Sequence, residues 1–184
     1  MEKLYALCSD AGAEEYIKLT GEFAELSGPC RRGEPQYLTR DPVAFEIAEE
    51  GGLEIPDVLA QEGVLFVSDQ FRAALMDAGQ NHLFFKRVDV DSVHFGIHET
   101  FWITVVPRID CLDAEASGLE GCWDAEDGVI PCWEPARICI NPACAGRYGI
   151  FRLLGVADDT VYVREPLYRK LCSAGFAGLD FFEL

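Results

Sequence analysis

The apolar residues between positions 64 and 85 change their spacing twice, which predicts a strand, a helix and a second strand. In the middle of this stretch they follow the i, i+3, i+4, i+7 spacing of one helix face: Phe71, Ala74, Leu75 and Ala78. Ser68 or Asp69 can cap the start of the helix, and Gly79 stands where a left-handed residue often ends one. The flanking runs, Val64–Val67 and residues 83–85, are short, apolar and rich in β-forming residues.

The same pattern returns 96 positions later. Residues 65–85 (LFVSDQFRAALMDAGQNHLFF) align without a gap with residues 161–181 (VYVREPLYRKLCSAGFAGLDF). Six pairs are identical: Val67 and Val163, Leu75 and Leu171, Ala78 and Ala174, Gly79 and Gly175, Leu83 and Leu179, Phe85 and Phe181. In the second copy Pro166 suits the first helical position. The offset is too long for a solenoid period, so it indicates one duplicated β-α-β unit. Neither copy holds a glycine-rich phosphate loop or a nucleophile elbow, so the repeat is a scaffold.

Strand patterns occupy much of the remaining chain. Apolar runs or alternation predict strands at residues 4–9, 15–19, 43–49 and 148–156, and extend the strand after Phe85 through residues 86–93. The turn formed by residues 10–12 allows the first two strands to pair. Residues 101–112 (FWITVVPRIDCL) give the strongest strand signal and predict a central strand, with Pro107 at a bulge or at the end of pairing.

Two other stretches have different compositions. Residues 28–37 (GPCRRGEPQY) indicate a loop, and residues 55–63 (IPDVLAQEG) fit a short helix. We therefore predict one α+β domain spanning residues 1–184, in which two related β-α-β units pack on a mixed β-sheet with additional N-terminal strands. Its parts are N-terminal strands and loops (1–61), the first unit with the central strand (62–112), a loop (113–147) and the second unit (148–184).

The charge is strongly acidic and unevenly distributed. The formal net charge is −17, which argues against nucleic acid or an anionic membrane as a direct ligand, because both require a basic surface. Residues 1–62 hold fourteen acids and five bases, residues 111–134 hold seven acids and no base, and residues 135–184 hold five acids and six bases. The acidic excess either serves solubility or steers a basic partner into contact.

Residues 113–142 lose all periodicity and combine acidic residues with tryptophan, cysteine, glycine and proline. Aromatic anchors surrounded by charge are typical of protein interfaces. The alternative is that the tryptophans pack inward and hold the loop in place. The predicted partner-binding residues are Asp113, Glu115, Glu120, Trp123, Asp124, Glu126, Asp127 and Trp133.

Two groups of residues are candidate metal ligands. His94, His98 and Glu99 lie in a β-like context, where i and i+4 side chains stand roughly 13 Å apart, too far for one zinc ion. Cys122, Cys132, Cys139 and Cys144 lack paired CxxC knuckles, and buried free thiols are the alternative to a zinc site. The sequence therefore predicts no metal and no cofactor, with the cysteine cluster kept as an alternative.

Nothing in the sequence predicts an enzyme. GxSxG is absent, and Cys30, beside Arg31 and Arg32, has no histidine close in sequence to act as its base. The first ten residues show no secretory signal and no apolar run is long enough for a membrane span, so we expect a cytoplasmic protein. In that compartment the cysteines are thiols, with Cys8, Cys30, Cys111 and Cys172 in the core or in loops.

Several segments resemble a known family. They are IDCLD with Ser117 four residues beyond Asp113, then IFRL, and the closing GLDFFEL. Over residues 62–184 the chain resembles immunity protein family eleven of the bacterial polymorphic toxin systems, and it is similar to the related double-CxxCG immunity proteins, although the paired CxxCG motifs are missing here.

The resemblance implies a cytoplasmic protein that binds and blocks a cognate toxin, encoded by a neighbouring gene, and it carries over no catalytic residue. Two other classes remain open. One is an acidic DNA mimic that inhibits a nucleic-acid enzyme. The other is a zinc-stapled module or enzyme that uses the cluster from Cys122 to Cys144.

Overall fold

The computed structural model describes residues 3–9, 14–92, 94–118, 138–156 and 159–184. Their strands are β1 (Leu4–Ser9), β2 (Leu19–Thr20), β3 (Ala44–Ile47), β4 (Val58–Gln61), β5 (Val64–Val67), β6 (Phe84–Ser92), β7 (Ile97–Val105), β8 (Arg108–Ile109), β9 (Ile150–Leu153), β10 (Val161–Arg164) and β11 (Leu179–Glu183). Their helices are α1 (Ala24–Arg32), α2 (Asp69–Asp77), α3 (Pro142–Ala145) and α4 (Glu165–Ala174), with a 3₁₀ turn at Pro35–Tyr37.

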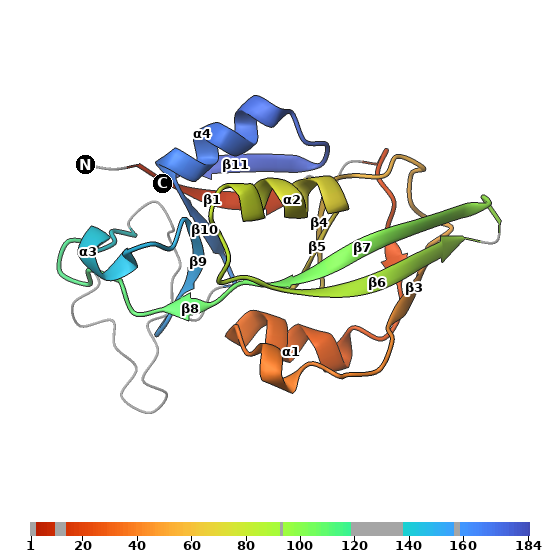
Figure 1. Cartoon of the computed structure of the whole chain (residues 1–184), viewed down its shortest axis with the longest axis horizontal. Coiled ribbons are helices and arrows are strands. Elements are labelled where there is room, and N and C mark those ends of the chain that lie inside the picture. Colours follow the sequence, from red (N-terminus) through yellow and green to blue (C-terminus); the bar gives the residue numbers. More distant parts are fainter. Residues whose placement is uncertain (1–2, 10–13, 93, 119–137, 157–158) are drawn as a thin grey trace.

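The described strands form two mixed sheets, which confirms the α+β class. One sheet has the order β2-β3-β6-β7-β5-β4 and the other has the order β11-β1-β10-β9-β8. The pairs β3–β6 and β8–β9 are parallel, and the remaining pairs are antiparallel. β7 lies between β6 and β5, the central position predicted for residues 101–112. Its pairing stops before Pro107, after which the chain enters the second sheet as β8 (Figure 1).

The two copies of the repeat have the same topology. In the first, β5 and β6 run parallel with antiparallel β7 between them. In the second, β10 and β11 run parallel with antiparallel β1 between them. The strand before each copy, β4 or β9, pairs antiparallel with the first strand of the unit. Each sheet is therefore built on one split β-α-β unit, although the strand inserted into the second unit comes from the N-terminus.

Both repeat helices pack into one core, called here the repeat core. Its buried residues include Val67, Leu75, Val163 and Leu171, which are two of the identical pairs of the alignment. Leu75 is 0% exposed and Leu171 is 1% exposed. Complete burial of such a side chain contributes about 1.5–3 kcal/mol. The duplicated apolar positions thus join the two sheets instead of serving two separate cores.

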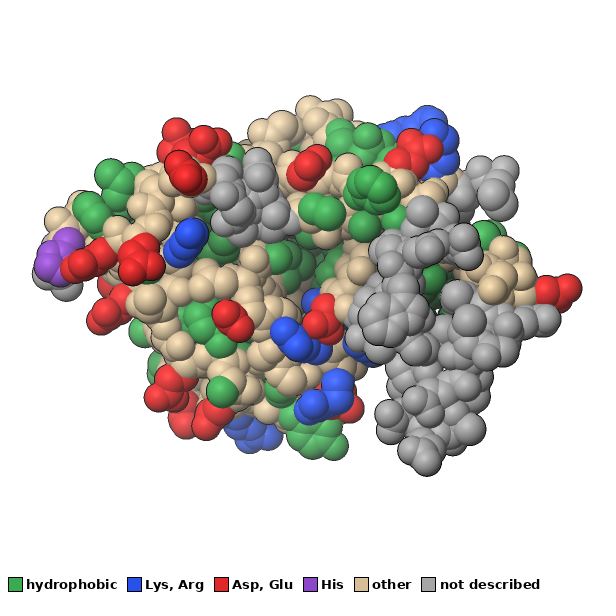
Figure 2. Space-filling model, turned by 180° about the vertical axis from the view of Figure 1, so that it is seen from behind, with side chains coloured by type: hydrophobic (Ala, Val, Ile, Leu, Met, Phe, Trp, Pro, Cys, Tyr) green, Lys and Arg blue, Asp and Glu red, His purple; other side chains and the backbone are tan. Residues whose placement is uncertain are grey.

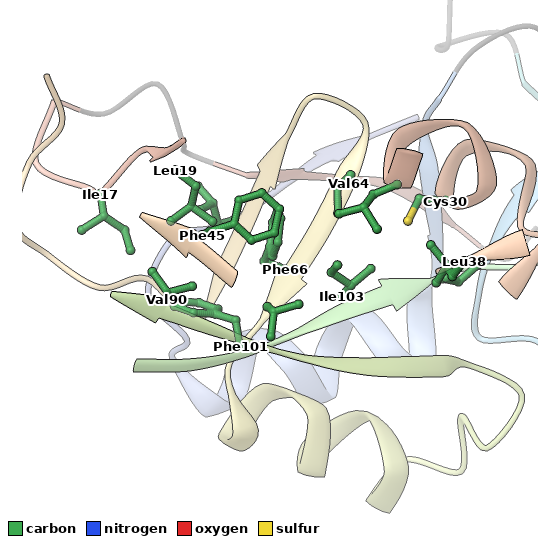
Figure 3. Close-up of a cluster of buried hydrophobic side chains, with 14 of the residues drawn as sticks. Ile17, Leu19, Cys30, Leu38, Phe45, Val64, Phe66, Val90, Phe101 and Ile103 are labelled. Atoms are coloured by element: carbon green, nitrogen blue, oxygen red, sulfur yellow. The ribbon is translucent and has the colours of Figure 1, made fainter. Parts of the chain in front are cut away.

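A second core lies on the other face of the six-stranded sheet, under α1 (Figures 1 and 3). Phe45, Phe66 and Phe101 are its largest side chains, and the rings of Phe45 and Phe66 meet edge to face with centroids 5.1 Å apart. Phe66 points into this core while its neighbours on β5 point into the repeat core. A strand covered on both faces accounts for the uninterrupted apolar run VLFV.

The prediction of a loop at residues 28–37 was wrong for its first half. α1 runs through Pro29 to Arg32 and ends at Gly33, whose φ is +69°. Leu26 and Cys30, four residues apart, are both buried under the sheet, and this burial offsets the backbone hydrogen bond that Pro29 cannot donate. Leu26 and Cys30 have the i, i+4 spacing of a helix face in the sequence, but Pro29 and the charged residues around it are typical of a loop.

The helix predicted at residues 55–63 is also wrong. This stretch contains β4, which forms a hairpin with β5 through Glu62 and Gly63. Both turn residues have positive φ (53° and 78°), as a two-residue turn of type I′ requires. Val58 and Leu59 are buried on opposite faces of the strand, a gain that outweighs the helix propensity of the local sequence.

The predicted pairing of the first two strands is a third correction. β1 belongs to the five-stranded sheet, whereas β2 is shorter than residues 15–19 predicted and pairs with β3 in the other sheet. β1 instead fills the gap between β10 and β11, where both of its edges are satisfied. The turn at residues 10–12 lies outside the described residues.

Candidate interaction surface

The predicted interface loop starts at a tightly bonded turn. The Asp113 side chain accepts a hydrogen bond from the Ala116 amide (2.9 Å), and the Asp113 carbonyl accepts one from the Ser117 hydroxyl (2.6 Å). The Ser117 hydroxyl in turn accepts a bond from the Cys139 amide (2.8 Å). Asp113 and Ser117 therefore fasten the start of the loop to the chain that leaves it, a structural role for the IDCLD segment. Glu115 is exposed on this turn.

The other predicted partner-binding residues lie outside the described residues: Glu120, Trp123, Asp124, Glu126, Asp127 and Trp133. The loop they belong to is anchored at both ends, by the turn at Asp113 and by an isolated bridge between Leu112 and Ile140. Its partner-binding role stays a prediction.

A second acidic surface, which the sequence did not predict, lies at the exposed end of the six-stranded sheet. A groove of about 570 Å³, called here the β3 groove, has acidic side chains from three separate segments: Glu22, Glu46 and Asp91. The described lining residues include no base. A smaller hollow beside it is lined by Glu46, Asp91 and His94. Figure 2 shows acidic and histidine side chains gathered at one end of the molecule.

The β6–β7 hairpin contributes Asp91 to the β3 groove and carries several further charged pairs. Asp91 and His98 are directly opposite each other on the two strands and form an ion pair. The hydrogen bond and the charge of Asp91 raise the pKa of His98 above its usual 6.5. On the same strand Asp89 pairs with Arg87 (3.1 Å), and at the tip His94 lies 3.5 Å from Glu49.

The hairpin directs the side chains of His98 and Glu99 away from each other. His98 is opposite Asp91 and Glu99 is opposite Val90, so His98 and Glu99 point to opposite faces of the hairpin. Among the described residues no group of three or more His, Cys, Asp or Glu side chains could hold a metal ion. In the cysteine cluster Cys139 and Cys144 are described and are free thiols, whereas Cys122 and Cys132 lie outside the described residues.

The buried thiols are protonated rather than activated. Burial raises the pKa of Cys30 to about 11, and burial followed by the neighbouring Cys144 raises that of Cys111 to about 12. An activated cysteine has a depressed pKa, so the arginines beside Cys30 do not make it a nucleophile. Cys8 and Cys172 are exposed, on β1 and α4.

Comparison with protein families decides the class. Residues 12–184 match the model of the Immunity protein family (Imm11). The chain belongs to this family. The resemblance seen in residues 62–184 is confirmed, and it extends through α1 and the β3 groove. Family membership assigns the protein to toxin immunity. The comparison with curated proteins finds no match to this sequence. Among the described residues, the helices of this Imm11 protein are too short or too polar to cross a membrane.

The β3 groove escaped the sequence analysis for a topological reason. Its three acids lie 24 and 45 residues apart in the chain. Glu46 and Asp91 meet because β3 pairs in parallel with β6, and Glu22 lies near them because it follows β2, which pairs with β3. Alternation in residues 43–49 does place Glu46 on the outer face of its strand, which was the available signal. That signal predicts on which face of the strand Glu46 lies, but it does not predict which strand pairs with β3.

Proposed function

We propose that this Imm11 protein neutralises a cognate toxin by binding it directly, and that the toxin presents a basic surface. The observation that carries the proposal is the net charge of −17, found in a chain that belongs to a family of immunity proteins. Toxins that act on nucleic acids need basic surfaces to hold phosphates, so an acidic inhibitor matches such toxins and associates with them rapidly.

We place the encounter in the cytoplasm and the toxin gene beside the gene of this protein. The six described cysteines are free thiols, the state that a reducing cytoplasm maintains. This supports the location expected from the sequence.

We further propose that the acidic loop between Asp113 and Cys139 contacts the toxin. Its anchored ends fix where it leaves the domain, and its two tryptophans supply the aromatic residues that interface centres favour. The β3 groove is the competing surface, because its described lining also combines three acids with no base.

Two variants with the same change in net charge separate these surfaces. The loop variant replaces Asp124, Glu126 and Asp127 with serine, and the groove variant replaces Glu22, Glu46 and Asp91 with serine. Binding of the purified toxin domain is measured by calorimetry at about 0.01 M and about 0.1 M salt, between which the Debye length falls from roughly 30 Å to roughly 10 Å.

We expect the loop variant to bind about tenfold more weakly at low salt and to show a flatter salt dependence, because three close ion pairs are lost. The groove variant, which changes the overall field equally, should lose less. A loss confined to the groove variant would move the interface to β3. Unchanged affinity and unchanged protection in the loop variant would remove the loop from the interface.

A further inference from the structure

A basic pocket stands out on this acidic surface, at the junction of the two repeat units. The pocket has a volume of about 200 Å³, and three of its lining side chains are cationic: Arg147, Arg164 and Lys170. None of its described lining residues is acidic. In the whole chain acids outnumber bases by 32 to 15, so a site whose described lining holds three bases and no acid departs strongly from the composition.

The floor of the basic pocket is held rigidly. Gln80 is 6% exposed, and its side chain accepts a hydrogen bond from the Gly149 amide (2.9 Å) and donates one to the Ala78 carbonyl (3.1 Å). A Cβ at position 149 would lie 2.9 Å from the Gln80 side-chain amide, so a larger residue there would displace this amide from its hydrogen bonds. The end of α2 and the start of β9 are thereby fixed against each other beneath the cations.

Two of these cations, Arg164 and Lys170, have uncharged counterparts in the first copy of the repeat. Arg164 aligns with Ser68, which caps α2 by accepting a bond from the Phe71 amide (3.1 Å). At the start of α4 the Arg164 side chain makes no capping bond, and a positive charge at a helix N-terminus is unfavourable. Lys170 aligns with Ala74 on the same helix position of the first copy.

The three cations line the same pocket, and two of them make further interactions there. Arg164 donates to the Gly146 carbonyl (2.8 Å), which directs it toward the segment that carries Arg147. Burial lowers the pKa of His82, and the charge of Arg147 lowers it further, against the opposing effect of a hydrogen bond to the Ile150 carbonyl. Clustered like charges repel, and an anion between them relieves that repulsion.

We propose that the basic pocket binds an anion, either a carboxylate or a phosphate group. Its volume is below the roughly 300–1,000 Å³ of pockets that enclose drug-sized ligands, so the ligand is one acidic group and not a whole nucleotide. The group comes either from an acidic side chain of the bound toxin or from free phosphate. The pocket itself does not depend on the proposed toxin interface.

The first test uses inorganic phosphate and the full-length protein. The double variant Arg147→Gln, Lys170→Gln removes two exposed cations and leaves Arg164, which is bonded to the backbone, in place. The control combines Arg40→Gln with Lys18→Gln, two exposed cations that do not line the pocket. Phosphate affinity should fall about tenfold or more in the pocket variant and stay within about twofold in the control.

An independent readout is the NMR titration of His82. Phosphate should raise the His82 pKa in the wild-type protein and not in the pocket variant, because a bound anion offsets the charge of Arg147. The proposal is overturned if the wild-type protein binds no phosphate, or if the pocket variant and the control bind it equally.

A second experiment identifies the source of the anion. Displacement of phosphate by the toxin indicates a toxin carboxylate, whereas simultaneous binding indicates a free anion.

Discussion

At the scale of single residues, several of the described polar side chains hold segments of the chain together through hydrogen bonds. Asp113 and Ser117 close a turn, Gln80 holds two segments under the basic pocket, and Cys30 is a buried thiol with a raised pKa. The ion pair of His98 and Asp91 differs, because its strength depends on pH in the physiological range.

Asp91→Asn should return the His98 pKa toward 6.5, because the Asp91 hydrogen bond and charge are what raise it. With a raised pKa in the folded state, the pair contributes stability that is fully present below pH 6.5 and is lost as the pH rises through the folded pKa. An NMR titration of both proteins measures this, with His82 as the distant control. A wild-type His98 that titrates at or below 6.5 would contradict the structure of the hairpin.

At the scale of elements, the local sequence pattern was sufficient to predict a helix or strand where the spacing of its apolar residues determines the secondary structure. α2, α4 and their flanking strands could be predicted because apolar spacing, Ser68, Pro166 and the terminal glycines agree. β4 could not be predicted, because its sequence suits a helix and only pairing with β5 makes it a strand. The two-sheet arrangement and the β3 groove depend on long-range pairing, which no local pattern contains.

The repeat core predicts that equivalent substitutions in the two copies have similar effects. Leu75→Ala and Leu171→Ala should each lower the free energy of unfolding by about 2–5 kcal/mol, because both side chains are fully buried in one cluster. Met76→Ala, at a side chain that is 38% exposed, should change it by less than about 1 kcal/mol. Urea denaturation measures all three. A cost below about 1 kcal/mol at either leucine would show that the two units do not share this core.

At the scale of the whole molecule, one shared core joins two sheets, and the described surface carries both an acidic groove and a basic pocket. The acidic loop and the β3 groove suit a basic surface, and the basic pocket suits a single anion on or near it. A mixed pattern of this kind gives specificity, since a partner with the wrong arrangement of charges is repelled.

The most direct measurement is the activity of the purified toxin domain while this protein is titrated into the reaction, with no other component present. We expect activity to fall in proportion to the added protein and to reach zero at one molecule per toxin, because direct binding blocks the toxin. Full toxin activity in the presence of a molar excess of folded protein would contradict neutralisation by direct contact.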